Sequence, residues 1–148
     1  VAQYYHDGLA GSPRDCRQAE EWAARAEEAG AKPARNARVW ILATCPVPGQ
    51  RESARALELA QFMIKRKDEL GWQELDTVAA ALAANGDFER AVEFQSLAID
   101  KMTADGELSR EVRTKAQKRL KARLDHYRNG RDYVVDYRAI DEMRTSRL

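Results

Sequence analysis

The feature that most constrains this 148-residue chain is a turn, Asn85-Gly86-Asp87, with an alanine-rich segment on each side of it. Before the turn, apolar residues recur at spacings of three and four, which places them on one face of a helix: Leu75, Val78, Ala79 and Leu82. Gly86 can adopt the left-handed backbone that ends a helix, and Asp87 can then accept from the free N–H groups of the next one. The sequence therefore predicts a helical hairpin over residues 71–102.

The second helix of this hairpin repeats the same spacing. Its predicted inner face consists of Phe88, Ala91, Val92, Gln95, Ala98, Ile99 and Met102. Two helices pack closely only where the side chains between them are short, so we expect Ala91 to lie at the closest approach of the pair.

The hairpin resembles one tetratricopeptide repeat, a helix-turn-helix unit of about 34 residues that stacks on copies of itself. Ala79, Ala91 and Ala98 stand where the family has small residues. Gln95 stands where an aromatic residue is usual and Thr103 where a proline is usual, so the copy is divergent.

Residues 1–30 resemble the last part of a Sel-like repeat, a relative of the tetratricopeptide repeat with a longer loop. The resemblance is carried by Tyr5, Gly8, Gly11, Asp15, Ala19, Trp22, Ala26 and Gly30. Asp15 and Gln18 have the spacing of a helix-capping box, which predicts a helix over residues 16–29 that Gly30 ends.

Residues 34–67 resemble a variant bacterial repeat in which the first helix ends in Trp-x-Leu-Ala-Thr-Cys-Pro. Trp40, Leu42, Ala43, Thr44, Cys45 and Pro46 match that motif. Proline disfavours helix in the residue before it, so Pro46 and Pro48 should end the helix. Across the chain, Ala19, Ala56 and Ala91 are 37 and 35 residues apart, close to the period of a solenoid of helical pairs.

A long helix is predicted over residues 108–130, and its narrow apolar stripe and wide polar surface suit the cap of a solenoid. The stretch from 126 to 133 resembles the Tyr-Arg-x-Gly-x-x-Tyr ending of this bacterial family. We therefore expect an all-α, right-handed helical-pair solenoid over residues 1–137 with a C-terminal capping helix, followed by a tail at 138–148. Because the chain starts at Val1 rather than at a methionine, we also expect it to be a piece of a longer protein.

Several function classes find little support in the sequence. The net charge is only +1, and the longest apolar runs, 78–84 and 39–43, are far shorter than the roughly 20 residues that span a bilayer. The two histidines, His6 and His126, have no partner at the spacing of a metal site, and there is no phosphate-binding loop. We expect no membrane span, no metal or cofactor, and no enzymatic activity.

The repeat resemblance implies a protein-interaction scaffold, which binds a peptide or a partner helix in a concave groove lined by the first helix of each pair. Mapped onto this chain, the groove would be lined by Asn36, Val39, Gln73 and Asp76. The alternative is a structural spacer or a capping subunit of a larger assembly.

Positive charge concentrates near the end of the chain, where residues 107–131 hold nine basic and three acidic residues. The predicted basic surface consists of Arg113, Lys115, Lys118, Arg119, Lys121 and Arg123. It is either a solvated face or a docking surface for an acidic protein, a nucleic acid or an anionic membrane. No aromatic residue lies among these cations, which argues against stacking on a single-stranded nucleic acid but leaves a contact with phosphates open. We rank an acidic protein above a nucleic acid as the partner.

The predicted topology brings Cys16 and Cys45 close together, because one opens a helix and the other closes the neighbouring antiparallel helix. Either both are small buried residues, or they form a disulfide. The resemblance to bacterial repeats leaves a cytoplasmic or periplasmic location open, and a disulfide would favour the periplasm.

Overall fold

The computed structural model describes residues 14–136, 138 and 142, and within them the chain is all-helical, with no strand. This confirms the all-α prediction. The elements are α2 (Cys16–Glu28), α3 (Ala34–Thr44), α4 (Ser53–Ile64), the short 3-10 turn η2 (Lys67–Glu69), α5 (Trp72–Ala84), α6 (Phe88–Ala104) and α7 (Arg110–Arg128). His6, the first part of the predicted Sel-like repeat and all but two residues of the predicted tail lie outside the described residues.

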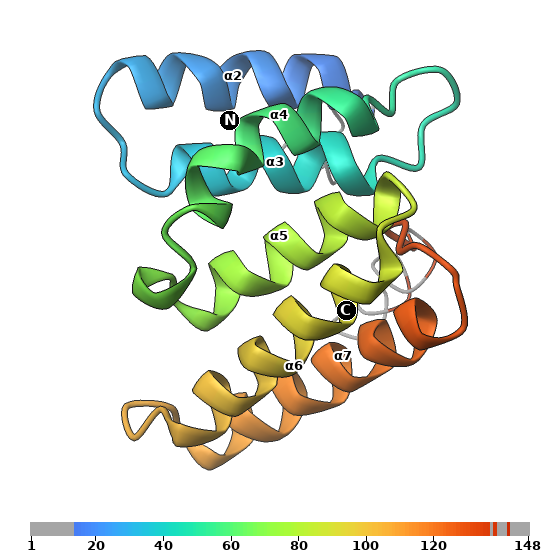
Figure 1. Ribbon diagram of the computed structural model, residues 1–148. Helices are drawn as coiled ribbons and strands as arrows, with labels where there is room; N and C mark the ends of the chain where they lie inside the picture. The colour runs from blue at the N-terminus through green and yellow to red at the C-terminus, as the bar shows by residue number, and fades with distance from the viewer. Residues whose placement is uncertain (1–13, 137, 139–141, 143–148) are drawn as a thin grey trace.

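The helices pack in chain order, each against the next (Figure 1). Among the extensive helix–helix contacts of the described residues one skips a helix, since α3 packs against α5 as well as against α2 and α4. In the described part no helix is long and apolar enough to cross a membrane.

The predicted turns have the expected local structure. Gly86 has a φ of +80°, and the Asp87 side chain accepts from the backbone N–H of Arg90. Asp15 caps α2 in the same way, and Ala91 is fully buried in the α5–α6 seam. Helix α7 begins two residues later than predicted, because Ser109 caps it by accepting from the N–H of Val112.

The main core is built by α3, α4, α5 and α6, with one residue from α7. Its larger buried side chains include Val39, Leu42, Met63, Leu75, Val78, Leu82, Phe94 and Tyr127. A separate and smaller cluster lies between α2 and α3 and consists of Cys16, Ala19, Ala23, Ile41 and Cys45.

Cys16 and Cys45 form a disulfide, with 6.2 Å between their Cα atoms. The bond joins the first residue of α2 to the residue that ends α3, so the predicted neighbour topology is confirmed. Of the two alternatives for these cysteines, the structure shows the bonded one.

The carbonyl groups in the last turn of α3 have no partner inside the helix, and donors come from the loop that follows α3 and from the segment after α7. The Leu42 carbonyl accepts from the backbone N–H of Glu52 at 3.3 Å, and the Ala43 carbonyl accepts from Arg51 Nε at 2.9 Å. The Thr44 carbonyl, the last of α3, accepts from the backbone N–H of Val135, which follows α7. The end of α3 therefore contacts both the loop that precedes α4 and the segment that follows α7.

Candidate interaction sites

The four residues predicted to line a groove do not lie together on one surface. Gln73 is exposed and Asn36 is half-buried, but Val39 is fully buried in the main core and Asp76 is buried as well. The prediction that Val39 and Asp76 line an open groove is therefore wrong. Both face inward because α3 and α5 pack against each other and α7 supplies a partner that covers Asp76.

That partner is Arg123, which was predicted to belong to the basic surface. Its Nε and Nη2 atoms donate to the Asp76 carboxylate at 2.8 and 2.7 Å, and Gln95 Nε2 donates to the same carboxylate at 2.9 Å. Burial alone would lower the pKa of Arg123, but the charge and hydrogen bonds of Asp76 raise it overall, so the guanidinium stays charged. Arg123 lies three residues after Leu120, on the buried stripe of α7, which is why it points inward.

The remaining predicted basic residues divide into two groups. Arg113 is half-buried and donates to the carbonyl of Asp105 at 2.6 Å, and Lys115 pairs with Glu111 at 2.8 Å. The group that stays exposed, with no ion pair in the described part of the chain, consists of Lys118, Arg119 and Lys121.

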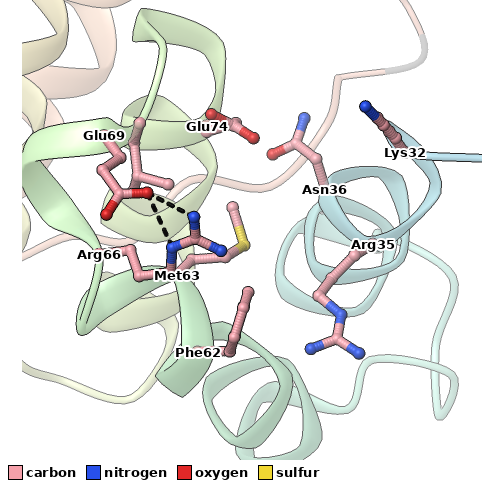
Figure 2. Close-up of a pocket in the computed structure, with 9 residues that line it drawn as sticks. Lys32, Arg35, Asn36, Phe62, Met63, Arg66, Glu69 and Glu74 are labelled. Carbon is pink, nitrogen blue, oxygen red and sulfur yellow. Dashed lines mark hydrogen bonds and ion pairs between the residues drawn. The ribbon is translucent and has the colours of Figure 1, made fainter.

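A cleft opens between the start of α3, the end of α4, η2 and the start of α5 (Figure 2). We call it the α3–α4–α5 cleft, and it is lined by Lys32, Arg35, Asn36, Phe62, Met63, Arg66, Glu69, Leu70 and Glu74. Phe62 is 53% exposed, and the guanidinium groups of Arg35 and Arg66 lie 5.5 and 5.2 Å from its ring centre. Such distances allow cation–π attraction, which orients the aromatic ring.

Two carboxylates hold these arginines in place. Arg66 Nε donates to Glu69 at 2.9 Å, and Arg35 pairs with Glu27 at 2.5 Å. The exposed Phe62 ring therefore lies beside two guanidinium groups whose positions are fixed by ion pairs with carboxylates.

The cleft also contains an acceptor without a donor. The Asn36 side chain points toward Glu74 in Figure 2, and its Oδ1 atom is buried and has no hydrogen-bond partner in the described structure. A buried carbonyl oxygen without a donor costs free energy. The cleft volume of about 210 Å³ is below that of typical small-molecule sites and suits one or two side chains of a peptide.

Of the cleft residues, only Asn36 was singled out from the sequence. Phe62 could have been found, because it lies off the buried stripe that Ala56, Ala60 and Met63 form on α4. An aromatic residue outside the apolar face of a helix is a signal of an exposed contact.

In the part of the chain that the structure describes, no cluster of histidine, cysteine, aspartate and glutamate residues could hold a metal ion. The Tyr127 hydroxyl is buried without a hydrogen-bond partner in the described residues, and burial and the nearby Asp76 raise the pKa of this phenol. Comparison of the chain with protein-family models, with curated proteins and with solved structures found no match.

Proposed function

We propose that this chain is a non-catalytic interaction module of the tetratricopeptide and Sel-like kind, which binds an extended peptide of a partner protein in the α3–α4–α5 cleft. The contact of α3 with α5 is the packing expected of right-handed stacked helical pairs. The disulfide favours an oxidising compartment such as the bacterial periplasm.

The observation that carries this proposal is the exposed ring of Phe62 between two guanidinium groups. Aromatic and arginine side chains dominate the binding energy of protein interfaces. Here Arg35 lies on α3 and Phe62 on α4, and Arg66 lies in the turn that follows α4. An apolar side chain of the peptide would pack on Phe62. A neighbouring acidic side chain would meet the exposed ammonium of Lys32.

Selection from a displayed library of random peptides tests the proposal and requires no purified partner. Selected peptides should bind Phe62→Ala about tenfold more weakly or worse, because truncation of a central aromatic residue costs about 2 kcal/mol or more and tenfold corresponds to about 1.4 kcal/mol. The matched control is Gln61→Ala, an exposed neighbour outside the cleft, which should bind as the parent does. Failure to enrich any peptide, or peptides that bind Phe62→Ala normally, would reject this site.

A second candidate function is the binding of an acidic partner by α7, favoured by the exposure of Lys118, Arg119 and Lys121. Replacing all three with glutamate should slow association and flatten its salt dependence, since exposed charges act mainly on the rate of encounter. If binding to polyglutamate at low salt were unchanged by this triple change, these residues would be only a solvated face. A chain that bound nothing in either assay would favour the structural spacer.

A further inference from the structure

After α7 the chain turns at Gly130, whose φ is +65°, and runs back to the end of α3 (Figure 1). We call residues 131–136 the strap. The carboxylate of Asp132 forms an ion pair with Arg51 at 2.7 Å, and the backbone N–H of Val135 donates to the carbonyl of Thr44 at 3.0 Å. A short continuous segment is thus fixed by one charge pair and one main-chain hydrogen bond to distant residues.

The aromatic ring of Tyr133 supplies the third contact. Its centre lies 5.8 Å from the ring of Trp40, 6.2 Å from the ring of His126 and 5.1 Å from the guanidinium of Arg123. Val134 is 37% exposed and Val135 only 8%, so three of the four residues from Asp132 to Val135 contact the protein and Val134 points to solvent. Contacts of this kind along a short segment without helix are typical of a bound peptide.

The residues that receive the strap are held by other contacts. Arg51 Nε also donates to the Ala43 carbonyl, and Arg123 is fixed by both oxygens of Asp76. The Thr44 carbonyl belongs to α3 itself. The receiving surface therefore keeps its shape when the strap leaves, which is the preorganisation that a binding site requires.

We propose that the strap is the resident ligand of a second peptide site, and that this site also binds a partner peptide of the same chemistry. That chemistry is an acidic residue, then an aromatic one, then any residue, then a branched aliphatic one. The site lies at the opposite end of α3 from the cleft that contains Asn36, so it does not depend on the function proposed for that cleft.

Tethering gives the strap an advantage over any free peptide. A segment joined by a short linker has an effective concentration on the order of millimolar at its site. A free peptide should therefore bind the parent chain weakly, and should bind well once the contacts of the strap are removed.

The experiment uses the full chain and the fluorescent hexapeptide Arg-Asp-Tyr-Val-Val-Asp, with binding followed by anisotropy. The peptide should bind the Tyr133→Ala chain at least about tenfold more tightly than the parent, because the tethered competitor is weakened. The control variant is Val134→Ala, which changes an exposed strap residue and should bind as weakly as the parent does. A hexapeptide with alanine in place of tyrosine should not bind any of the three chains.

Circular dichroism establishes that each variant is folded, and Asp132→Asn replaces Tyr133→Ala if the latter is not. Equal affinity of the parent and of the folded variant for the peptide, or no binding to either, would overturn the proposal. A charge exchange gives a second check, since Arg51→Glu should bind the hexapeptide with lysine in place of its first aspartate and lose the original one.

Discussion

The α2–α3 seam and the α5–α6 seam each join two helices that follow one another in the chain, but the two seams are stabilised differently. Between α5 and α6 the buried residues belong to the main core and include leucine, valine and phenylalanine. Between α2 and α3 the buried cluster contains two alanines, one isoleucine and the two bonded cysteines.

Polar contacts reinforce the smaller seam. Arg38 pairs with Glu20 at 2.8 Å and with Glu27 at 2.7 Å, and Arg55 of α4 reaches Glu20 at 3.2 Å. Hydrophobic stabilisation scales with the apolar area buried, and alanines bury little. The comparison shows that a helical pair with short side chains can be completed by a covalent bond and ion pairs where apolar burial is small.

The largest expected effect comes from breaking the buried ion pair that joins the larger seam to α7. Asp76→Ala should cost about 3 to 5 kcal/mol of unfolding free energy, because it leaves the buried Arg123 without its counter-ion. Denaturant unfolding measures this loss. The double change Asp76→Leu with Arg123→Met should recover most of it, and equal destabilisation of both variants would contradict a penalty from an unpaired charge.

Removal of the disulfide should have the next largest effect and should act on the smaller seam. The sequence separation of 29 residues corresponds to about 3 to 4 kcal/mol in the chain-entropy model. Unfolding with and without a reducing agent measures the loss. A Cys16→Ala, Cys45→Ala chain serves as the control and should show no response to the reductant, while a parent as stable after reduction would show that the ion pairs suffice.

Ala91→Leu tests whether the larger seam is as closely packed as its complete burial indicates. The added side chain has no space between α5 and α6, and overpacking should cost about 1 to 3 kcal/mol. Thermal or denaturant unfolding gives the value, with the exposed Ala104→Leu as a control. A variant as stable as the parent would mean that the helices can separate without loss.

Acid should weaken the α2–α3 seam selectively, and this is the smallest of the four changes in stability that we predict. Burial raises the pKa of Glu27, but hydrogen bonds from Arg38 and Arg35 outweigh it and bring the pKa below its usual value. The resulting stability is present above the unfolded pKa of about 4 and is lost as the pH falls through the folded one. Hydrogen exchange at α2 should therefore increase below about pH 4, and Glu27→Gln should remove that part of the pH dependence.

The helices and the turns between them were largely predictable because their signals are local. The turn at Gly86, the caps at Asp15 and Asp87, and the buried Ala91 each follow from residues within a few positions of one another. The proximity of Cys16 and Cys45 could also be predicted from the sequence, since it required only that two neighbouring helices run antiparallel.

The interaction sites were less predictable because their contacts join distant residues. Asp76 and Arg123 are 47 positions apart, and a polar residue on a helix indicates a surface position unless its buried partner is known. The contact of Val135 with Thr44 likewise has no local signal. The positions of the apolar residues along α4 would have indicated that Phe62 is exposed. They carry no information on Arg35 and Arg66, which approach its ring from other parts of the chain.

The attachment of two chain segments to the end of α3 has a consequence for the cooperativity of unfolding. In a linear stack of helices the terminal units fray first, because each touches only one neighbour. Here the disulfide fastens α2 to the end of α3, and the strap fastens the continuation of α7 to the same turn. Opening of α2 must therefore disturb a central helix, whereas the strap can leave while α3 stays in place, so the covalently attached end is the one whose fraying is joined to the unfolding of the core.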